Sequence, residues 1–218
     1  MTFQTMVGLL TQGFGTTLVI FFLTLIGSLP LGLLVWAGRR SRFAPLRWLV
    51  QGYISVMRGT PLMLQLMVVY FGPNLLLGIK IPQNWRFWAA IVAFVVNYAA
   101  YFAEIYRGGI DSIPPGQYEA AQVLGYGKGQ TFFRIIFPQM VKRVIPSVTN
   151  EIITLVKDTS LASVIAVVEV FTRARQIVVA PNTPGMLAYA VAAVYYYVFN
   201  YLVAYAMERV EKAFAYYN

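Results

Sequence analysis

The 218-residue sequence contains no cysteine and no histidine. These two absences exclude disulfides, thiolate chemistry, Cys/His metal sites and histidine proton relays, so we expect no metal site. Charged residues are scarce as well. They make up 11% of the chain, whereas soluble domains carry about 25%. Hydrophobic residues account for 59%, and the composition therefore predicts an integral membrane protein.

The formal net charge is +9, which in a soluble protein could indicate nucleic-acid binding. Here the Lys and Arg residues lie between apolar runs, which is the distribution that membrane proteins show. We therefore expect a lipid membrane, and no nucleic acid, as a partner. The start of the chain, MTFQTMVGLLTQGFG, has no Lys or Arg, unlike the basic start of a cleavable signal peptide, so the first span is predicted to be retained.

Apolar segments predict an all-α polytopic membrane protein that forms a single transmembrane domain over residues 1–218. Five transmembrane helices are predicted, at residues 16–37, 53–71, 86–106, 140–158 and 186–207. An odd number of spans places the termini on opposite sides of the membrane. An external N-terminus puts most basic loop residues in the cytoplasm, among them Arg39, Arg40, Lys142 and Arg143, as the positive-inside rule requires. The C-terminus and the loop between the third and fourth spans are then cytoplasmic.

Several breaks interrupt this pattern. Arg58-Gly59-Thr60-Pro61 lies near the start of the second span, where we expect Pro61 to kink the helix. Residues 72–74 are expected to end that span, and a loop is expected up to residue 85. Residues 161–170 are too few to cross a bilayer and predict a re-entrant or interfacial piece. A loop is predicted to follow over residues 171–185.

The cytoplasmic segment of residues 111–138 predicts two short helices around a glycine hinge. Asp111 and Ser112 can cap the first helix, and Pro114 and Pro115 suit its first turn. Gly125 suits the left-handed position that ends it. The second helix is predicted over residues 128–137, ending at Pro138. From composition alone, this segment could equally be a hairpin that merely covers the helical bundle.

A motif in this segment resembles the EAA loop of ABC importer permeases. It consists of Glu119, Ala120, Ala121, Gly125, Ile135 and Pro138. Phe137 departs from the family pattern, which has leucine there, but both side chains are apolar. In that family the loop forms a coupling helix that docks in a groove of an ATPase subunit. The resemblance therefore implies that these six residues couple the chain to an ATPase.

Further segments resemble the polar amino acid permeases of that family. They are Arg58-Gly59-Thr60-Pro61, the AEIYRGGI stretch at residues 103–110 and the KDTSL stretch at residues 157–161. The resemblance implies the permease subunit of an ATP-driven importer for polar amino acids, in the bacterial inner membrane. It also implies two ATPase subunits, a second permease copy or a related permease chain, and an extracytoplasmic amino-acid-binding protein.

The chain itself is expected to bind no cofactor. A phosphate loop needs Ser or Thr after its Gly-Lys pair, whereas Gly129 follows Lys128 here. ATP and Mg are therefore expected on the partner ATPase. No nucleophile–base pair indicates a catalytic residue, so a membrane enzyme is disfavoured. The alternative transporter class is an ion-coupled secondary amino acid transporter, which usually shows paired inverted repeats; we find none.

Polar residues within the spans are candidates for the substrate pathway. In the fourth span they recur at i, i+4, i+7 and i+11, which places them on one helical face. These residues are Ser147, Glu151, Thr154 and Asp158. Asn97, near the middle of the third span, is expected to face the same cavity. The alternative is that such groups satisfy one another between helices.

Arg58 and Glu104 are predicted to lie at the same depth near the cytoplasmic side. This match predicts an ion pair or a shared polar cluster. We interpret the pair as structural rather than substrate-binding, and with Pro61 it is a candidate for gating.

Overall fold

The computed structural model describes residues 1–82, 84–181 and 185–214, and these residues form helices and connecting segments without any strand. Within them, three helices are long and apolar enough to cross a membrane: α1 (Phe3–Arg39), α4 (Trp85–Asp111) and α9 (Leu187–Ala213). A fourth candidate arises if α2 (Ala44–Gly59) and α3 (Leu62–Leu77) count as one broken span. The polytopic helical fold is therefore confirmed at this level.

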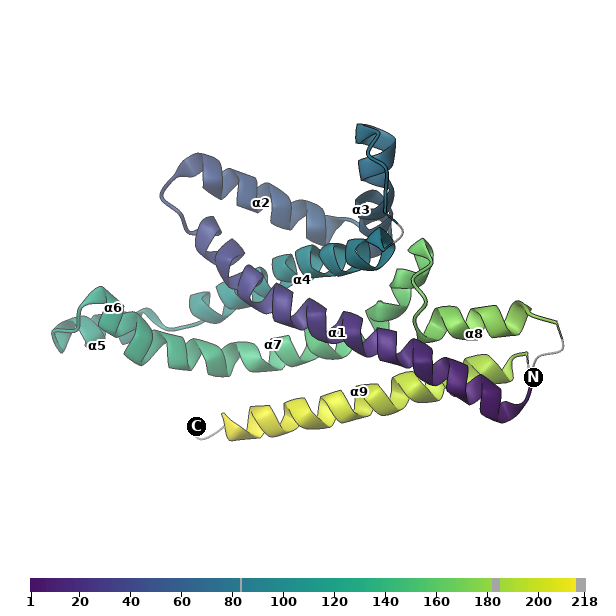
Figure 1. Cartoon of the computed structure of the whole chain (residues 1–218). Coiled ribbons are helices and arrows are strands. Elements are labelled where there is room, and N and C mark those ends of the chain that lie inside the picture. Colours follow the sequence, from purple (N-terminus) through teal and green to yellow (C-terminus); the bar gives the residue numbers. More distant parts are fainter. Residues whose placement is uncertain (83, 182–184, 215–218) are drawn as a thin grey trace.

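The molecule is elongated along these helices. Figure 1 shows the N-terminus at one end, and the end of α9 at the other, together with α5 (Pro115–Val123) and α6 (Lys128–Thr131). α7 (Phe137–Asp158) runs back from this end, and α8 (Val170–Val179) lies near the N-terminal part of α1. The helices pack around buried aromatic side chains of α4, including Phe94, Tyr98 and Phe102.

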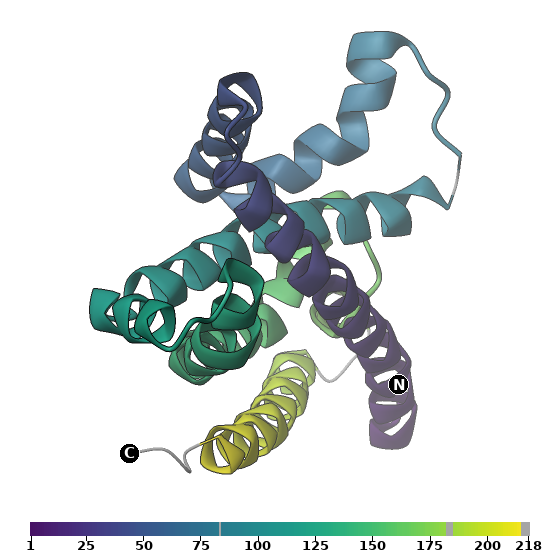
Figure 2. The ribbon, with the colours of Figure 1, turned by 90° about the vertical axis from the view of Figure 1, so that its left-hand side faces the viewer.

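The contact between α1 and α4 depends on glycine. A Cβ atom on Gly32 would lie 2.9 Å from Phe102 Cβ and 3.2 Å from the carbonyl oxygen of Ala99. A Cβ atom on Gly27 would lie 2.8 Å from Val95. Small residues let membrane helices approach closely, and these two glycines on α1 allow its crossing over α4 (Figure 2).

The predicted kink at Pro61 is a complete break. α2 and α3 meet at 113°, and Thr60 between them is extended, with φ −123° and ψ 147°. A residue that precedes proline is disfavoured in the helical region, which explains why the helix stops before Pro61.

The predicted end of the second span at residues 72–74 is wrong. α3 continues through Pro73 to Leu77, and Gly78 ends it in the left-handed conformation with φ 64°. The backbone N–H groups of Gly78 and Ile79 donate to the carbonyls of Asn74 and Pro73 at 3.0 and 3.1 Å. A glycine that satisfies the last carbonyls sets the helix end, and it lies beyond the proline.

The prediction of a loop over residues 171–185 is also wrong for the first residues of that range, which belong to the helix α8. It follows a short 3-10 helix, η2 (Thr159–Ile165), in the segment predicted to be re-entrant. Glu169 caps α8: its carboxylate accepts from the backbone N–H groups of Phe171 and Thr172. Residues 182–184 of the predicted loop lie outside the described residues.

In the segment of residues 111–138, the first predicted helix is present as α5. The second predicted helix does not end where it was expected to. α6 continues into the π-helix η1 (Phe132–Ile136) and then into α7 without stopping at Pro138. The N–H of Phe137 donates to the carbonyl of Phe132. Pro138 therefore lies where the hydrogen bonding changes from the π to the α pattern, a position that tolerates a missing N–H.

The predicted capping of α5 by Asp111 and Ser112 is wrong as well. Ser112 ends α4, while Pro114 precedes α5 without a side-chain cap. Pro115 occupies the first turn of α5, as expected.

Candidate functional site

Three polar residues of α7, Ser147, Glu151 and Thr154, lie on the side away from its packed face. Ile152 and Leu155 are buried in the core, whereas Ser147 and Thr154 are exposed. Glu151 and Asp158 are half-buried. Asp158 accepts a 2.8 Å hydrogen bond from the hydroxyl of Tyr98 on α4. The helix thus has the polar face and the apolar back that its sequence pattern predicts.

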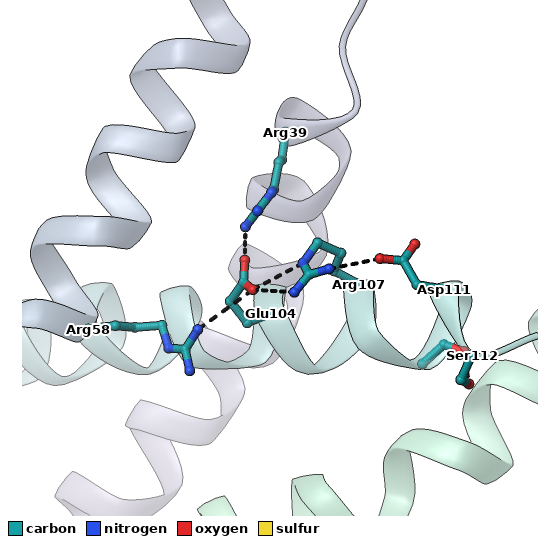
Figure 3. A network of polar contacts seen from close by, with 7 residues as sticks. Arg39, Arg58, Glu104, Arg107, Asp111 and Ser112 are labelled. Carbon is teal, nitrogen blue, oxygen red and sulfur yellow. Dashed lines mark hydrogen bonds and ion pairs between the residues drawn. The ribbon is translucent and has the colours of Figure 1, made fainter.

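A cluster of charges joins three helices around Glu104 of α4 (Figure 3). Arg58 Nη1, at the end of α2, lies 3.6 Å from Glu104 Oε2, so the predicted ion pair is present. Arg39, at the end of α1, pairs with the other carboxylate oxygen. Arg107 Nη2 lies 2.9 Å from Glu104 Oε2, and its Nη1 lies 2.8 Å from Asp111. One carboxylate therefore ties α1, α2 and α4 together.

A cavity of about 410 Å³ opens beside this cluster, between α4 and α7. We call it the polar cavity. Its lining consists of Arg58, Tyr101, Glu104, Ile105, Arg107, Gly108, Gly109, Ser112, Arg143, Val144, Ser147 and Glu151. It brings the predicted pathway residues Ser147 and Glu151 together with Arg58 and Glu104. Thr154 and Asp158 are not among its lining residues.

Guanidinium groups line the polar cavity alongside the carboxylates. The Arg58 guanidinium lies over the ring of Tyr101, 5.4 Å from its centroid. Arg143 donates to the carbonyl oxygen of Ser112. The cavity can therefore offer both a carboxylate, at Glu151, and cationic groups to a solute.

Asn97 does not face this cavity, contrary to the prediction. Its side chain is 4% exposed, and its Nδ2 donates to Gln65 Oε1 at 2.9 Å and to the Met57 carbonyl at 3.2 Å. Gln65 Nε2 in turn donates to the Thr60 hydroxyl at 2.8 Å. A broken helix leaves carbonyls without helical partners, and these two amides supply donors at the break between α2 and α3.

The EAA-like residues form a separate feature on and after α5. Glu119 and Ala120 are exposed, and Ala121 is buried. The helix ends in a Schellman motif, in which Gly125 has φ 75° and Tyr126 N donates to the Ala121 carbonyl at 3.0 Å.

The last two residues of the motif lie on the continuation toward α7. Ile135 and Pro138 line a cavity of about 390 Å³, together with Gln117, Arg134, Gln139, Lys142 and Phe214. Phe214 follows α9, so the end of that helix meets the EAA-like segment.

Several residues of these networks were not identified from the sequence. Arg39 belongs to a basic run, and only the crossing of α1 over α4 brings it to Glu104. Gln65 stands as a lone polar residue in the apolar stretch LMLQLMVVY. That isolation was a usable signal, because polar groups within membrane spans usually have a partner.

Glu169 is a second isolated polar residue that was not predicted to have a role. It is fully buried between η2 and α8 and accepts hydrogen bonds from Phe171 N at 2.7 Å, Thr172 N at 2.6 Å and the Tyr196 hydroxyl at 2.8 Å. Burial raises the pKa of the Glu169 carboxyl above its ordinary value, while these hydrogen bonds act in the opposite direction. The interactions tie α8 to α9.

In the part of the chain that the structure describes, no group of three or more acidic side chains could hold a metal ion.

Comparison with known proteins gives consistent matches. Residues 28–216 match the family model described as "Binding-protein-dependent transport system inner membrane component". The chain is 44% identical to the arginine transport system permease protein ArtQ of Bacillus subtilis (strain 168), over 76% of this chain and 74% of that protein. It is 35% identical to the L-cystine transport system permease protein TcyB of the same organism, over 94% and 86% of the two chains.

Solved structures show the same fold. A chain from a crystal structure of an amino acid ABC transporter with histidines has a TM-score of 0.87 and 31% identity, covering 98% of this chain and 99% of that one. A chain of the MetNI methionine ABC transporter in an inward-facing conformation has a TM-score of 0.72 at 21% identity, covering 99% and 100% of the two chains.

Proposed function

This chain belongs to the binding-protein-dependent transport system inner membrane components, and we propose that it forms the solute path of an ATP-driven importer for polar amino acids. The resemblance to ABC importer permeases and the location as a multi-pass protein of the bacterial plasma membrane agree with this membership. The relatives named above carry arginine and cystine transport in their names.

The polar cavity carries the proposal. It combines Glu151 and Glu104 with Arg58 and Arg143 in a chain that is only 11% charged. A free amino acid presents an ammonium and a carboxylate, and ionic groups inside a membrane protein mark solute pathways. We propose that Ser147 and Glu151 contact the solute here. Thr154 and Asp158 extend the path along α7, and Asn97 supports it by holding the break between α2 and α3.

Gating is proposed at the end of α2. Arg58 lies in the last turn of that helix, just before the break at Pro61, and its partner Glu104 lies on α4. Movement of α2 about the break would shift Arg58 relative to Glu104, and the pair would in turn favour one of two packings.

Coupling is proposed at α5. Beside Glu119, the adjacent apolar side chains of Val123 and Leu124 are 87% and 72% exposed, and neighbouring exposed apolar residues can form a contact surface for a partner. We propose that Glu119, Ala120, Ala121 and Gly125 shape this helix for the groove of an ATPase subunit. Ile135 and Pro138 anchor it to α7. Two such subunits would bind ATP and Mg and drive the cycle.

Five membrane spans are proposed: α1, the α2–α3 pair, α4, α7 and α9. α7 has too many charges to count as a span by composition, but its polar face lines the polar cavity and its back is buried. The N-terminus is proposed outside and the C-terminus in the cytoplasm. The arrangement of α5, α6 and the end of α9 at one end of the molecule supports this topology. A second permease copy or a related chain, and an extracytoplasmic binding protein, complete the proposed importer.

Reconstitution tests the proposal. The chain, its ATPase and its binding protein are placed in liposomes, and uptake of labelled amino acids is measured with and without internal ATP. We expect uptake that requires ATP and is unaffected by ionophores. Uptake without ATP that collapses on ionophore addition would instead indicate an ion-coupled secondary transporter.

The substrate is identified by thermal stabilisation of the purified complex across the twenty amino acids. Loss of the Glu151 carboxylate in Glu151→Ala should weaken binding of the stabilising amino acid about tenfold, by roughly 1.4 kcal/mol. The matched control Glu208→Ala, at an exposed ion pair on α9, should bind normally. Unchanged affinity in Glu151→Ala would remove this residue from the pathway.

A further inference from the structure

A second, larger cavity lies away from the polar cavity, between the end of α1 and the segment of α5 and α6. Its volume is about 730 Å³. We call it the interfacial cavity. It is lined by Trp36, Arg40, Ile110, Tyr118, Gln122, Tyr126, Gly127, Lys128, Thr131 and Phe132. It shares no residue with the polar cavity, and neither transport nor gating uses it in the proposal above.

The charge in the interfacial cavity is of one sign. Arg40 and Lys128 are its ionic residues, and the described residues that line it include no carboxylate. Neither side chain forms an ion pair within residues 1–82, 84–181 and 185–214. Two cations at one cavity without an acidic partner create an anion-binding environment.

Aromatic rings hold one of these cations in place. The Arg40 guanidinium lies 5.6 Å from the centroid of the Trp36 ring. Trp36 in turn stacks on Phe132 of η1, with centroids 6.4 Å apart and an interplanar angle of 14°. The stack positions the guanidinium at the cavity and links the end of α1 to the segment before α7.

The surroundings are those of a membrane interface. α1 is a membrane-span candidate, and Leu33 and Leu34, just before Trp36, are 42% and 69% exposed. The chain then becomes basic, from Arg39 to Arg42. Exposed apolar residues followed along the chain by tryptophan and then arginine are typical of the point where a helix leaves the hydrocarbon core of the membrane.

We propose that the interfacial cavity binds the phosphate-bearing headgroup of an anionic phospholipid, with Arg40 and Lys128 as its cationic ligands. The acyl chains would lie along the exposed apolar face of α1. Basic pockets near the ends of membrane helices bind such headgroups by charge. An aromatic lining with an adjoining apolar surface favours a lipid over a small free anion.

The proposed lipid and the proposed ATPase would contact different faces of α5. Tyr118 and Gln122, four residues apart, share the face of α5 that lines the interfacial cavity. The exposed Val123 is turned to a different face. A bound lipid would therefore connect α1 to the back of the proposed coupling helix and leave its outer face free.

Native mass spectrometry of the full chain in a neutral detergent tests the proposal. Binding of phosphatidylglycerol is compared with that of zwitterionic phosphatidylcholine. The variant Arg40→Gln/Lys128→Gln removes both cations of the cavity. Arg42→Gln/Arg47→Gln is the matched control, because it removes the same net charge from neighbouring residues that do not line the cavity. Circular dichroism and gel filtration establish that both variants fold.

We expect tight binding of one phosphatidylglycerol, weakened roughly 20-fold in the cavity variant and little changed in the control. Equal weakening in both variants would show only general attraction to a basic surface and would overturn the proposal. So would equal binding of phosphatidylcholine, or displacement of the lipid by millimolar inorganic phosphate, which would indicate a site for small anions.

ATPase co-purification distinguishes this proposal from the coupling proposal. The cavity variant should lose lipid and still retain the ATPase. Loss of the ATPase with lipid binding unchanged would assign Arg40 and Lys128 to the ATPase interface, and the lipid proposal would then be wrong. Failure of wild-type coupling, with lipid binding as expected, would count only against the coupling proposal.

Discussion

Asn97 on α4 donates a 2.9 Å hydrogen bond to the side-chain oxygen of Gln65 on α3. Both residues are buried, and their amides donate to the backbone carbonyls of Met57 and Thr60, where α2 ends at the break before α3. Two side-chain amides thus hold a 113° bend that would otherwise leave polar groups unpaired.

Asn97→Leu should therefore destabilise the protein. The substitution leaves the buried Gln65 oxygen without its donor and removes one of the two donors to the Met57 carbonyl, at a cost of about 1–3 kcal/mol. Thermal unfolding in detergent measures the effect, and Gln51→Ala, at an exposed position on α2, is the control. An unchanged melting temperature in Asn97→Leu would show that the amide pair does not hold the bend.

Loss of Glu104 should reduce the stability of the protein more than loss of any one of the arginines that pair with it. Glu104→Gln leaves Arg39, Arg58 and Arg107 without their shared anion at a site where the carboxylate is only 12% exposed. The expected loss is roughly 3 kcal/mol. Arg58→Gln should cost less than about 1 kcal/mol, because this arginine is 46% exposed.

A double-mutant cycle on Arg58 and Glu104 measures their coupling through the same unfolding assay. Asp111→Asn, at an exposed pair with Arg107, should have little effect and serves as the control. Additive effects of Arg58→Gln and Glu104→Gln would contradict a direct contribution of this pair.

Gly125→Ala should destabilise the left-handed end of α5, the proposed coupling helix, without any steric collision. A Cβ atom there would meet nothing within 4 Å, but the backbone is left-handed, with φ 75°. A non-glycine residue in that conformation costs roughly 1–2 kcal/mol. Reduced ATPase co-purification is the measurement.

Gly129→Ala is the matched control, since Gly129 lies in α6 and its Cβ would also meet nothing within 4 Å. It should retain the ATPase fully. Equal retention in both variants would mean that the left-handed end of α5 is not needed for coupling.

Gly32→Ala should loosen the contact between α1 and α4. Its Cβ would lie 2.9 Å from Phe102 Cβ and 3.2 Å from the Ala99 carbonyl, so the two helices must separate. The expected cost is about 1–3 kcal/mol, measured as a lower melting temperature. Gly15→Ala, on the same helix with open space around it, should be neutral, and similar losses for both variants would rule out the steric explanation.

Much of the fold could be predicted because it depends on local properties. The long apolar runs of α1, α4 and α9 predict membrane helices from composition alone. Gly125 was identified as a left-handed helix end because few other residues adopt that conformation without strain. The Arg58–Glu104 pair was predicted because the two residues lie at the same depth in the membrane, each near the cytoplasmic end of its helix.

Two errors in the predicted helices have different physical causes. Pro138 was expected to end a helix, but the preceding π turn accommodates it. A loop was predicted from residue 171, yet the buried Glu169 caps α8 at this point and is itself held by Tyr196 of α9. Tyr196 lies far from Glu169 in the sequence, whereas the π turn directly precedes Pro138.

Hydropathy, periodicity and helix-end chemistry act between near neighbours, and they therefore predict the class of the protein, its membrane location, its helices and the motif of its family. The positions of the polar side chains depend instead on how the helices pack. The angle between α2 and α3 turned Asn97 toward Gln65, and the crossing of α1 over α4 brought Arg39 to Glu104. The same packing assembled Glu151 and Arg58 in one cavity and Arg40 and Lys128 in another. Such pairings depend on helix crossing angles, which follow from contacts between residues far apart in the chain.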